Sequence, residues 1–169
     1  MKRILLLLLL AAGFVGSTAI AATAACDGKL AVATGPYEGY PGEVMAHQPS
    51  SSFHAAVQQT LKGQPEWLQN LRGVGGPVRS YTSGQGSALI VVSVCQPHAC
   101  PDHMLYGVWD AQTGTFGAML WRNEQWQPLG TLGEPARAAI ACATGQDNAE
   151  ADKVRAFFDR TPLKAPWDR

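Results

Sequence analysis

Hydrophobic residues in the first half of the chain follow helical spacing. The Gly- and Pro-rich residues 35–42 predict an irregular entry segment. Apolar side chains at 53–61 then recur at i, i+3 and i+4 positions, the serines at 50–52 suit the N-cap of a helix, and Gly63 ends it. A proline in the first turn opens a second, shorter helix over residues 65–73. Two further helices are predicted late in the chain, at residues 135–143 and 150–159.

The middle of the chain predicts β structure instead. Strands are expected at residues 78–82, 88–95, 104–109 and 115–121. The run at 88–95 is apolar on both faces, which predicts a central strand covered by helices. Residues 110–114 form a hairpin signal that ends in glycine, and 122–125 form a second tight turn before Trp126. Strands that follow one another between helices favour an α+β fold with a central antiparallel β-sheet flanked by helices.

The first 25 residues have the three parts of a secretory signal. A short cationic start precedes a leucine run at residues 5–10, and an Ala-Thr-Ala site follows at 22–24. We therefore predict a signal peptide at 1–25 and a single mature domain at 26–169, with no stable membrane span after cleavage. A permanent anchor or lipidation of Cys26 are the minor alternatives. Export to the periplasm is the favoured localisation.

Composition and charge exclude several classes of protein. The chain is 46% hydrophobic and 15% charged, which excludes a disordered tail or a charged coil. Without the two cations of the leader, 11 basic and 13 acidic side chains give the mature chain a net charge of −2. Because no segment combines a Lys/Arg cluster with aromatic residues, nucleic acid is a poor candidate partner.

All four cysteines follow the leader, so export would bring each of them into an oxidising compartment. Three pairings are possible. Cys95 and Cys100 stand five positions apart after an apolar run, and most simply close a small loop. Cys26 and Cys142 are the remaining pair, unless lipidation of Cys26 leaves Cys142 as a free thiol.

The sequence contains only weak matches to catalytic and metal-binding motifs. Gly73-x-Gly75-Gly76 and Gly84-x-Gly86 lie outside any βαβ unit and are interpreted as turns, and no two carboxylates form an acid/base pair. Four closely spaced residues are of the types that bind Zn²⁺ or copper: Cys95, His98, Cys100 and His103. Such a site requires reduced thiols, which an oxidising compartment disfavours. We expect no catalytic residues, no metal and no cofactor. A periplasmic metal or small-ligand binding module is the rival hypothesis.

His98 has a special position. It lies at the apex of the short loop that follows the buried strand, beside Pro97, whose ring fixes φ. Exposed residues on rigid loops are where binding sites are commonly built. We therefore interpret His98 as a binding residue rather than as a loop histidine bonded to backbone.

These residues resemble a known family, the periplasmic inhibitors of vertebrate lysozyme, or Ivy family. Its hallmark is a disulfide-closed Cys-Lys-Pro-His-Asp-Cys loop after a strand, and this chain has Cys95-Gln96-Pro97-His98-Ala99-Cys100. The resemblance extends from about residue 53 to 145. Gln96 replaces the familiar lysine and Ala99 the familiar aspartate, so the loop lacks charged groups beside His98.

The resemblance implies a function and a fold. It implies a proteinaceous inhibitor, not an enzyme, that protects peptidoglycan by inserting this protruding loop into the active-site cleft of a c-type lysozyme. His98 would hydrogen-bond the catalytic carboxylates of the enzyme, framed by Cys95, Pro97 and Cys100. It also implies a sheet of about five strands, and it allows either a monomer or a homodimer. A family fold directed at another cell-wall muramidase is the further alternative.

Overall fold

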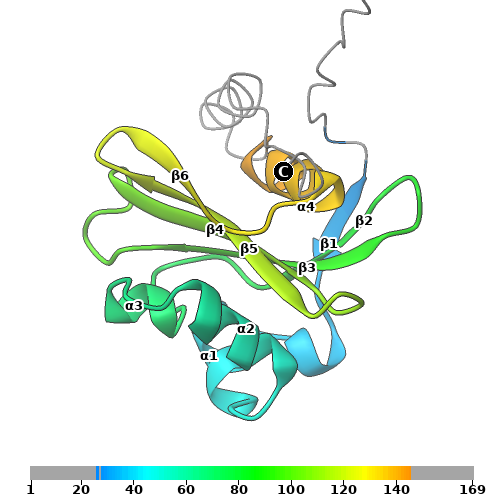
Figure 1. Ribbon diagram of the computed structural model, residues 1–169, viewed down its shortest axis with the longest axis horizontal. Coiled ribbons are helices and arrows are strands. Elements are labelled where there is room, and N and C mark those ends of the chain that lie inside the picture. The colour runs from blue at the N-terminus through cyan, green and yellow to red at the C-terminus, as the bar shows by residue number, and fades with distance from the viewer. Residues whose placement is uncertain (1–25, 27, 146–169) are drawn as a thin grey trace, which may run out of the picture.

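The computed structural model describes residues 26 and 28–145. Its centre is an antiparallel sheet of six strands in the order β1-β2-β3-β4-β5-β6 (Figure 1). The strands are β1 (Lys29–Val32), β2 (Arg79–Thr82), β3 (Ala88–Cys95), β4 (His103–Asp110), β5 (Thr115–Arg122) and β6 (Gln125–Gly130). The helices are α1 (Pro41–His47), α2 (Ser52–Thr60), α3 (Glu66–Gln69) and α4 (Glu134–Thr144), with a 3-10 turn at Gly35–Tyr37. The predicted α+β class is confirmed.

Helices cover both faces of the sheet. Figure 1 shows α4 on one face and α1, α2 and α3 on the other. The central strand β3 contributes Leu89 and Val91 to the core under α4, and Val92 and Val94 to the core under the other three helices. Because β3 is buried on both faces, its sequence is apolar except at Ser93, as the prediction of a central strand required.

The helix predicted after the serines is α2. Ser51 is its N-cap, and the Ser51 hydroxyl accepts a hydrogen bond from the backbone N–H of His54 at 3.1 Å. The next helix, α3, is shorter than predicted. It ends at Gln69, because Leu71 adopts a left-handed backbone with φ of 49° that no α-helix can continue through.

Two elements were not predicted, and β6 was indicated only by the tight turn predicted at 122–125. The first is β1, an edge strand of only four residues, too short to display the alternation that marks a half-buried strand. The second is α1, whose first two residues belong to the segment 35–42 that was expected to be irregular. Pro41 starts this helix in its first turn, and the Glu43 carboxylate accepts a hydrogen bond from the Tyr40 backbone N–H at 3.1 Å. The sheet therefore has six strands rather than about five.

Two predicted segments, the leader at 1–25 and the helix at 150–159, lie outside the described residues. Within the part of the chain that the structure describes, no helix is both long and apolar enough to cross a membrane.

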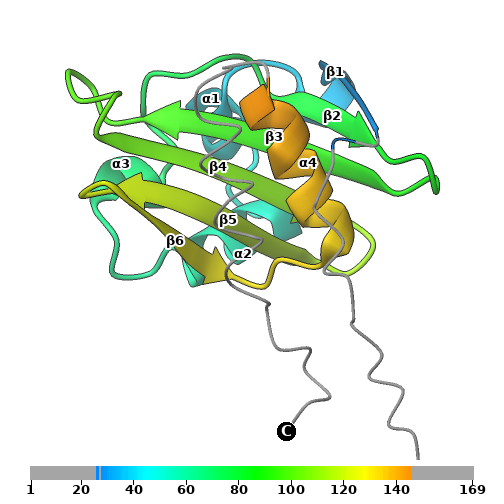
Figure 2. The same ribbon diagram turned by 90° about the horizontal axis from the view of Figure 1, so that it is seen from above.

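The antiparallel order places connections at two opposite ends of the sheet (Figure 2). We call the end with the β3–β4 and β5–β6 connections the loop end, and the end with the β2–β3 and β4–β5 connections the turn end. The loop end carries all six residues of the predicted binding loop, 95–100.

Candidate functional site

Residues 95–100 form a loop closed by a disulfide between Cys95 and Cys100, whose Cα atoms are 4.8 Å apart. A second disulfide joins Cys26 to Cys142. All four cysteines are therefore bonded. Cys95 is the last residue of β3, so the loop starts directly from a strand that is paired with β4 as far as Cys95 and with β2 over residues 88–91.

The apex of the loop is a β-turn. The backbone N–H of Ala99 donates to the Gln96 carbonyl at 3.0 Å, and Pro97 occupies the second position of the turn. His98 occupies the third position with φ of 67°. This is the pattern of a type II turn, in which glycine or asparagine normally occupies the left-handed position. A histidine there costs roughly 1–2 kcal/mol of backbone strain relative to glycine.

The apex is also the exposed part of the loop. Pro97 and His98 are exposed, whereas Gln96, Ala99 and Cys100 are partly buried. The His98 imidazole forms no hydrogen bond or ion pair within the described part of the chain. A strained backbone therefore presents an imidazole whose nitrogens are available to another molecule.

A second turn leads from the loop into β4. The Ala99 carbonyl accepts hydrogen bonds from the backbone N–H of Asp102 at 3.0 Å and of His103 at 2.9 Å. The indole N–H of Trp121, from β5, donates to the Pro101 carbonyl at 3.0 Å. The loop is thus tied to a neighbouring strand as well as to its own two strands.

The base of the loop is held from the other side by residues 73–75, which we call the strap. Val74 and Cys95 exchange two backbone hydrogen bonds of 2.9 and 2.7 Å. A Cβ at Gly73 would collide with the Cys95 carbonyl oxygen, and one at Gly75 with that of Ser93. The interpretation of these glycines as a turn was wrong, since they let the strap lie against the end of β3.

His103 is separated from the other residues of the predicted metal group. It is the first residue of β4, partly buried, and directly opposite Arg122 of β5. The sulfur atoms of Cys95 and Cys100 are bonded to each other. In the described ranges, no three His, Cys, Asp or Glu side chains are grouped so that they could hold a metal ion. The rival hypothesis of a metal module therefore gains no support from these residues.

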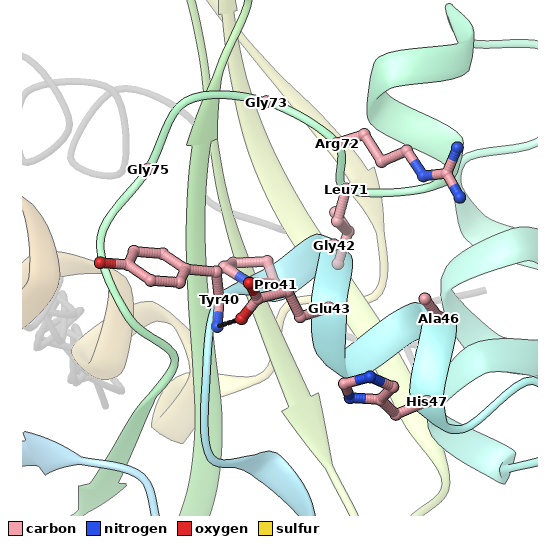
Figure 3. A pocket seen from close by; sticks show the side chains of 10 residues that line it. All are labelled: Tyr40, Pro41, Gly42, Glu43, Ala46, His47, Leu71, Arg72, Gly73 and Gly75. Atoms are coloured by element: carbon pink, nitrogen blue, oxygen red, sulfur yellow. Dashed lines mark hydrogen bonds between the residues drawn. The ribbon is translucent and has the colours of Figure 1, made fainter.

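A shallow pocket of about 370 Å³ lies under the strap, and none of its lining residues belongs to the loop (Figure 3). The strap glycines arch above the start of α1, and Tyr40 and Glu43 form the opposite wall. The carboxylate of Glu43 is already used by the Tyr40 backbone N–H, and the Arg72 side chain points away from both residues. The polar groups of this pocket therefore do not converge on a ligand position.

Comparison with known proteins identifies the family. The model of the family described as inhibitor of vertebrate lysozyme (Ivy) matches residues 52–146, more than half of the chain. No curated protein matches the chain. The matched segment begins at α2, ends just after α4 and includes the whole Cys95–Cys100 loop. The chain belongs to the Ivy family.

Proposed function

We propose that this Ivy family member inhibits c-type lysozyme by inserting the Cys95–Cys100 loop into the active-site cleft of the enzyme. In this proposal the His98 imidazole hydrogen-bonds the catalytic carboxylates. The single observation that carries the proposal is the exposed, unpartnered His98 on a left-handed backbone at the apex of a disulfide-closed turn.

The chemistry of the apex suits a cleft that contains carboxylates. A neutral imidazole has one N–H donor and a protonated imidazole has two. A hydrogen bond to an ionised carboxylate is worth about 1.5–3 kcal/mol, more than a bond between neutral groups. Because Gln96 and Ala99 are uncharged, His98 is the only titratable side chain between the two cysteines.

The rigidity of the loop supports tight binding. Its backbone is held by the disulfide, by the turn at Gln96–Ala99, by Trp121 and by the strap. A loop that is already ordered loses little conformational entropy when it enters a cleft. The loop therefore has the preorganisation that an inhibitor needs.

The proposal includes a location. A leader at 1–25 would export the chain to the periplasm, where such an inhibitor protects peptidoglycan. Lipid attachment at Cys26 would need a free thiol, and the disulfide with Cys142 uses that sulfur. We therefore propose an exported mature chain without a lipid anchor.

The direct test is a titration of enzyme activity. A c-type lysozyme acting on bacterial cell walls is titrated with mature protein under non-reducing conditions, beside the variant His98→Ala. We expect stoichiometric inhibition by the wild type and a loss of about 10- to 150-fold in the variant, from the bond energies above. The variant should keep the fold, because the side chain that it loses is exposed.

Two results would contradict the proposal. Equal inhibition by folded His98→Ala would remove the assigned role of the imidazole. Absence of inhibition by the folded, disulfide-closed wild type would exclude c-type lysozyme as the target. The same assay with other classes of muramidase would then test the alternative target.

A further inference from the structure

A row of side chains crosses the loop end from the loop to the β5–β6 hairpin. The backbone N–H of Gln96 donates to the His103 carbonyl at 3.1 Å, and His103 stands directly opposite Arg122. Directly opposed residues of an antiparallel pair point to the same face, with Cβ atoms about 5 Å apart. Because β4 lies between β3 and β5, Arg122 is two strands away from Gln96 at the base of the binding loop.

Arg122 lacks the partner that a partly buried arginine normally has. Its Nε atom is covered by protein and has no hydrogen-bond partner, and the same is true of Nδ1 of His103. Within the described residues, Arg122 forms no ion pair. Asp102 and Glu124, which adjoin this row in the chain, are exposed and do not pair with it. Partly buried charges without a partner are costly, so the Arg122 guanidinium would gain from a contact with an anionic group.

The Arg122 side chain is partly preorganised for contact with an anion. Because Nε is covered, the base of the guanidinium is packed against the protein and loses less rotamer freedom on binding than a fully exposed arginine would. The side chain as a whole is partly exposed, so an outside group can approach it. A planar guanidinium suits a carboxylate in particular, since two parallel N–H···O bonds can form.

We propose that Arg122 binds a carboxylate on the rim of the partner's cleft while His98 enters the cleft itself. This inference rests on the proposed function and extends it, since it assigns a second, charged contact outside the loop. The loop supplies no permanent positive charge of its own, because Gln96 and Ala99 are neutral. Arg122 then supplies a permanent positive charge that the loop itself lacks.

The test compares two variants with the same change in charge. Arg122→Gln removes the cation near the loop, and Lys62→Gln removes an exposed cation two residues after the end of α2, outside the loop end. Association and dissociation rates with a c-type lysozyme are measured at low and high salt for both variants and the wild type. We expect Arg122→Gln to weaken affinity about tenfold at low salt and to flatten its salt dependence, because the lost contact is ionic. Lys62→Gln should behave like the wild type, and Arg122→Lys should recover part of the loss.

The outcomes separate this inference from the proposed function. Wild-type binding together with an unchanged Arg122→Gln variant would overturn the role of Arg122 and leave the function of the loop intact. A loss of affinity that is equal at low and high salt would also overturn it, since a merely structural effect would not depend on salt. No binding by the wild type would overturn both.

Discussion

The loop end and the turn end of the sheet both reverse the chain twice, but they do so with different residues. At the turn end, glycines occupy the left-handed positions, Gly86 with φ of 87° and Gly114 with φ of 67°. Side chains there bond the local backbone, as when Asp110 accepts from the Gln112 N–H at 2.8 Å. At the loop end, His98 takes the left-handed position, and two consecutive left-handed residues, Asn123 and Glu124, make the β5–β6 turn.

The difference shows where the chain tolerates strain. Glycine adopts a positive φ without steric cost, whereas a residue with a Cβ pays roughly 1–2 kcal/mol. In the described part of the chain, the remaining left-handed residue other than glycine is Leu71, which precedes the strap. Backbone strain at residues other than glycine is typical of functional sites, where the side chain itself is needed. This strain supports the proposal that the loop end is the functional end of the sheet.

The two disulfides differ in the length of chain that they enclose. Cys26 lies three residues before Lys29, which pairs with Thr82 beside the β2–β3 turn, and its bond to Cys142 spans 116 residues. The bond between Cys95 and Cys100 spans only five. By loop-closure entropy the long link stabilises the fold by about 5 kcal/mol and the short one by about 2 kcal/mol. The long link serves stability, and the short one serves the shape of the loop.

The largest expected effect is on stability. Cys26→Ser/Cys142→Ser should lower the free energy of unfolding by about 5 kcal/mol and leave lysozyme affinity unchanged below the unfolding transition. Cys95→Ser/Cys100→Ser should cost only about 2 kcal/mol of stability yet reduce affinity, because the loop loses its preorganisation. Denaturant unfolding and binding titrations check both pairs. If the two variants lost affinity in proportion to their loss of stability, the two disulfides would not have the different roles assigned to them.

Replacing His98 with glycine should separate stability from binding. His98→Gly removes the imidazole and relieves the left-handed strain, so we expect affinity to fall by about 1.5–3 kcal/mol and stability to rise by about 1 kcal/mol. Gly114→Ala at the turn end is the matched control. Its Cβ would meet nothing within 4 Å, so only the left-handed backbone should cost about 1 kcal/mol, without any change in affinity. Loss of stability in His98→Gly would contradict the strain argument.

Adding a methyl group to the strap should loosen the base of the loop. A Cβ at Gly75 collides with the Ser93 carbonyl, whereas one at Gly76 meets nothing within 4 Å. We expect Gly75→Ala to lower stability by about 1–3 kcal/mol, as overpacking does, and to weaken lysozyme binding. Gly76→Ala should change neither by more than a few tenths of a kcal/mol. Amide hydrogen exchange at Val74 and Cys95 would report the loss directly, and unchanged protection in Gly75→Ala would refute the role of the strap.

The smallest expected effect concerns the hydrogen bond between Trp121 and the Pro101 carbonyl. Trp121→Phe keeps an aromatic ring but removes the donor, which should weaken lysozyme binding by about 1 kcal/mol. Trp126→Phe is the control, because the Trp126 indole N–H has no partner in the structure and its ring lies 5.3 Å from that of Trp121. If both variants lost the same affinity, ring packing rather than the hydrogen bond would support the loop.

The sequence predicted the elements whose signals are local. The strand β3 was found because residues 88–92 are continuously apolar, and α2 because serines precede a helical pattern. The Cys95–Cys100 loop was found because its two cysteines stand close together and frame a proline and a histidine. In each case the deciding residues are neighbours in the chain.

Contacts between distant segments escaped prediction. The strap forms because Gly73 and Gly75 pack against β3, about 20 residues away in the chain. The spacing of the glycines alone predicts a turn. The register of β4 and β5 brings Trp121 to the Pro101 carbonyl and Arg122 opposite His103, and the sequence of either strand does not determine that register. The short β1 is recognisable only once it is paired with β2.

The central claim is that the His98 imidazole contacts the catalytic carboxylates of a c-type lysozyme. A double-mutant cycle tests it most directly, with His98→Ala in this protein and a carboxylate-to-amide substitution at the catalytic acid of the enzyme. We expect a coupling energy of about 1–3 kcal/mol between the two substitutions, because each removes one partner of the same contact. Additive losses, with no coupling between the two sites, would contradict the claim.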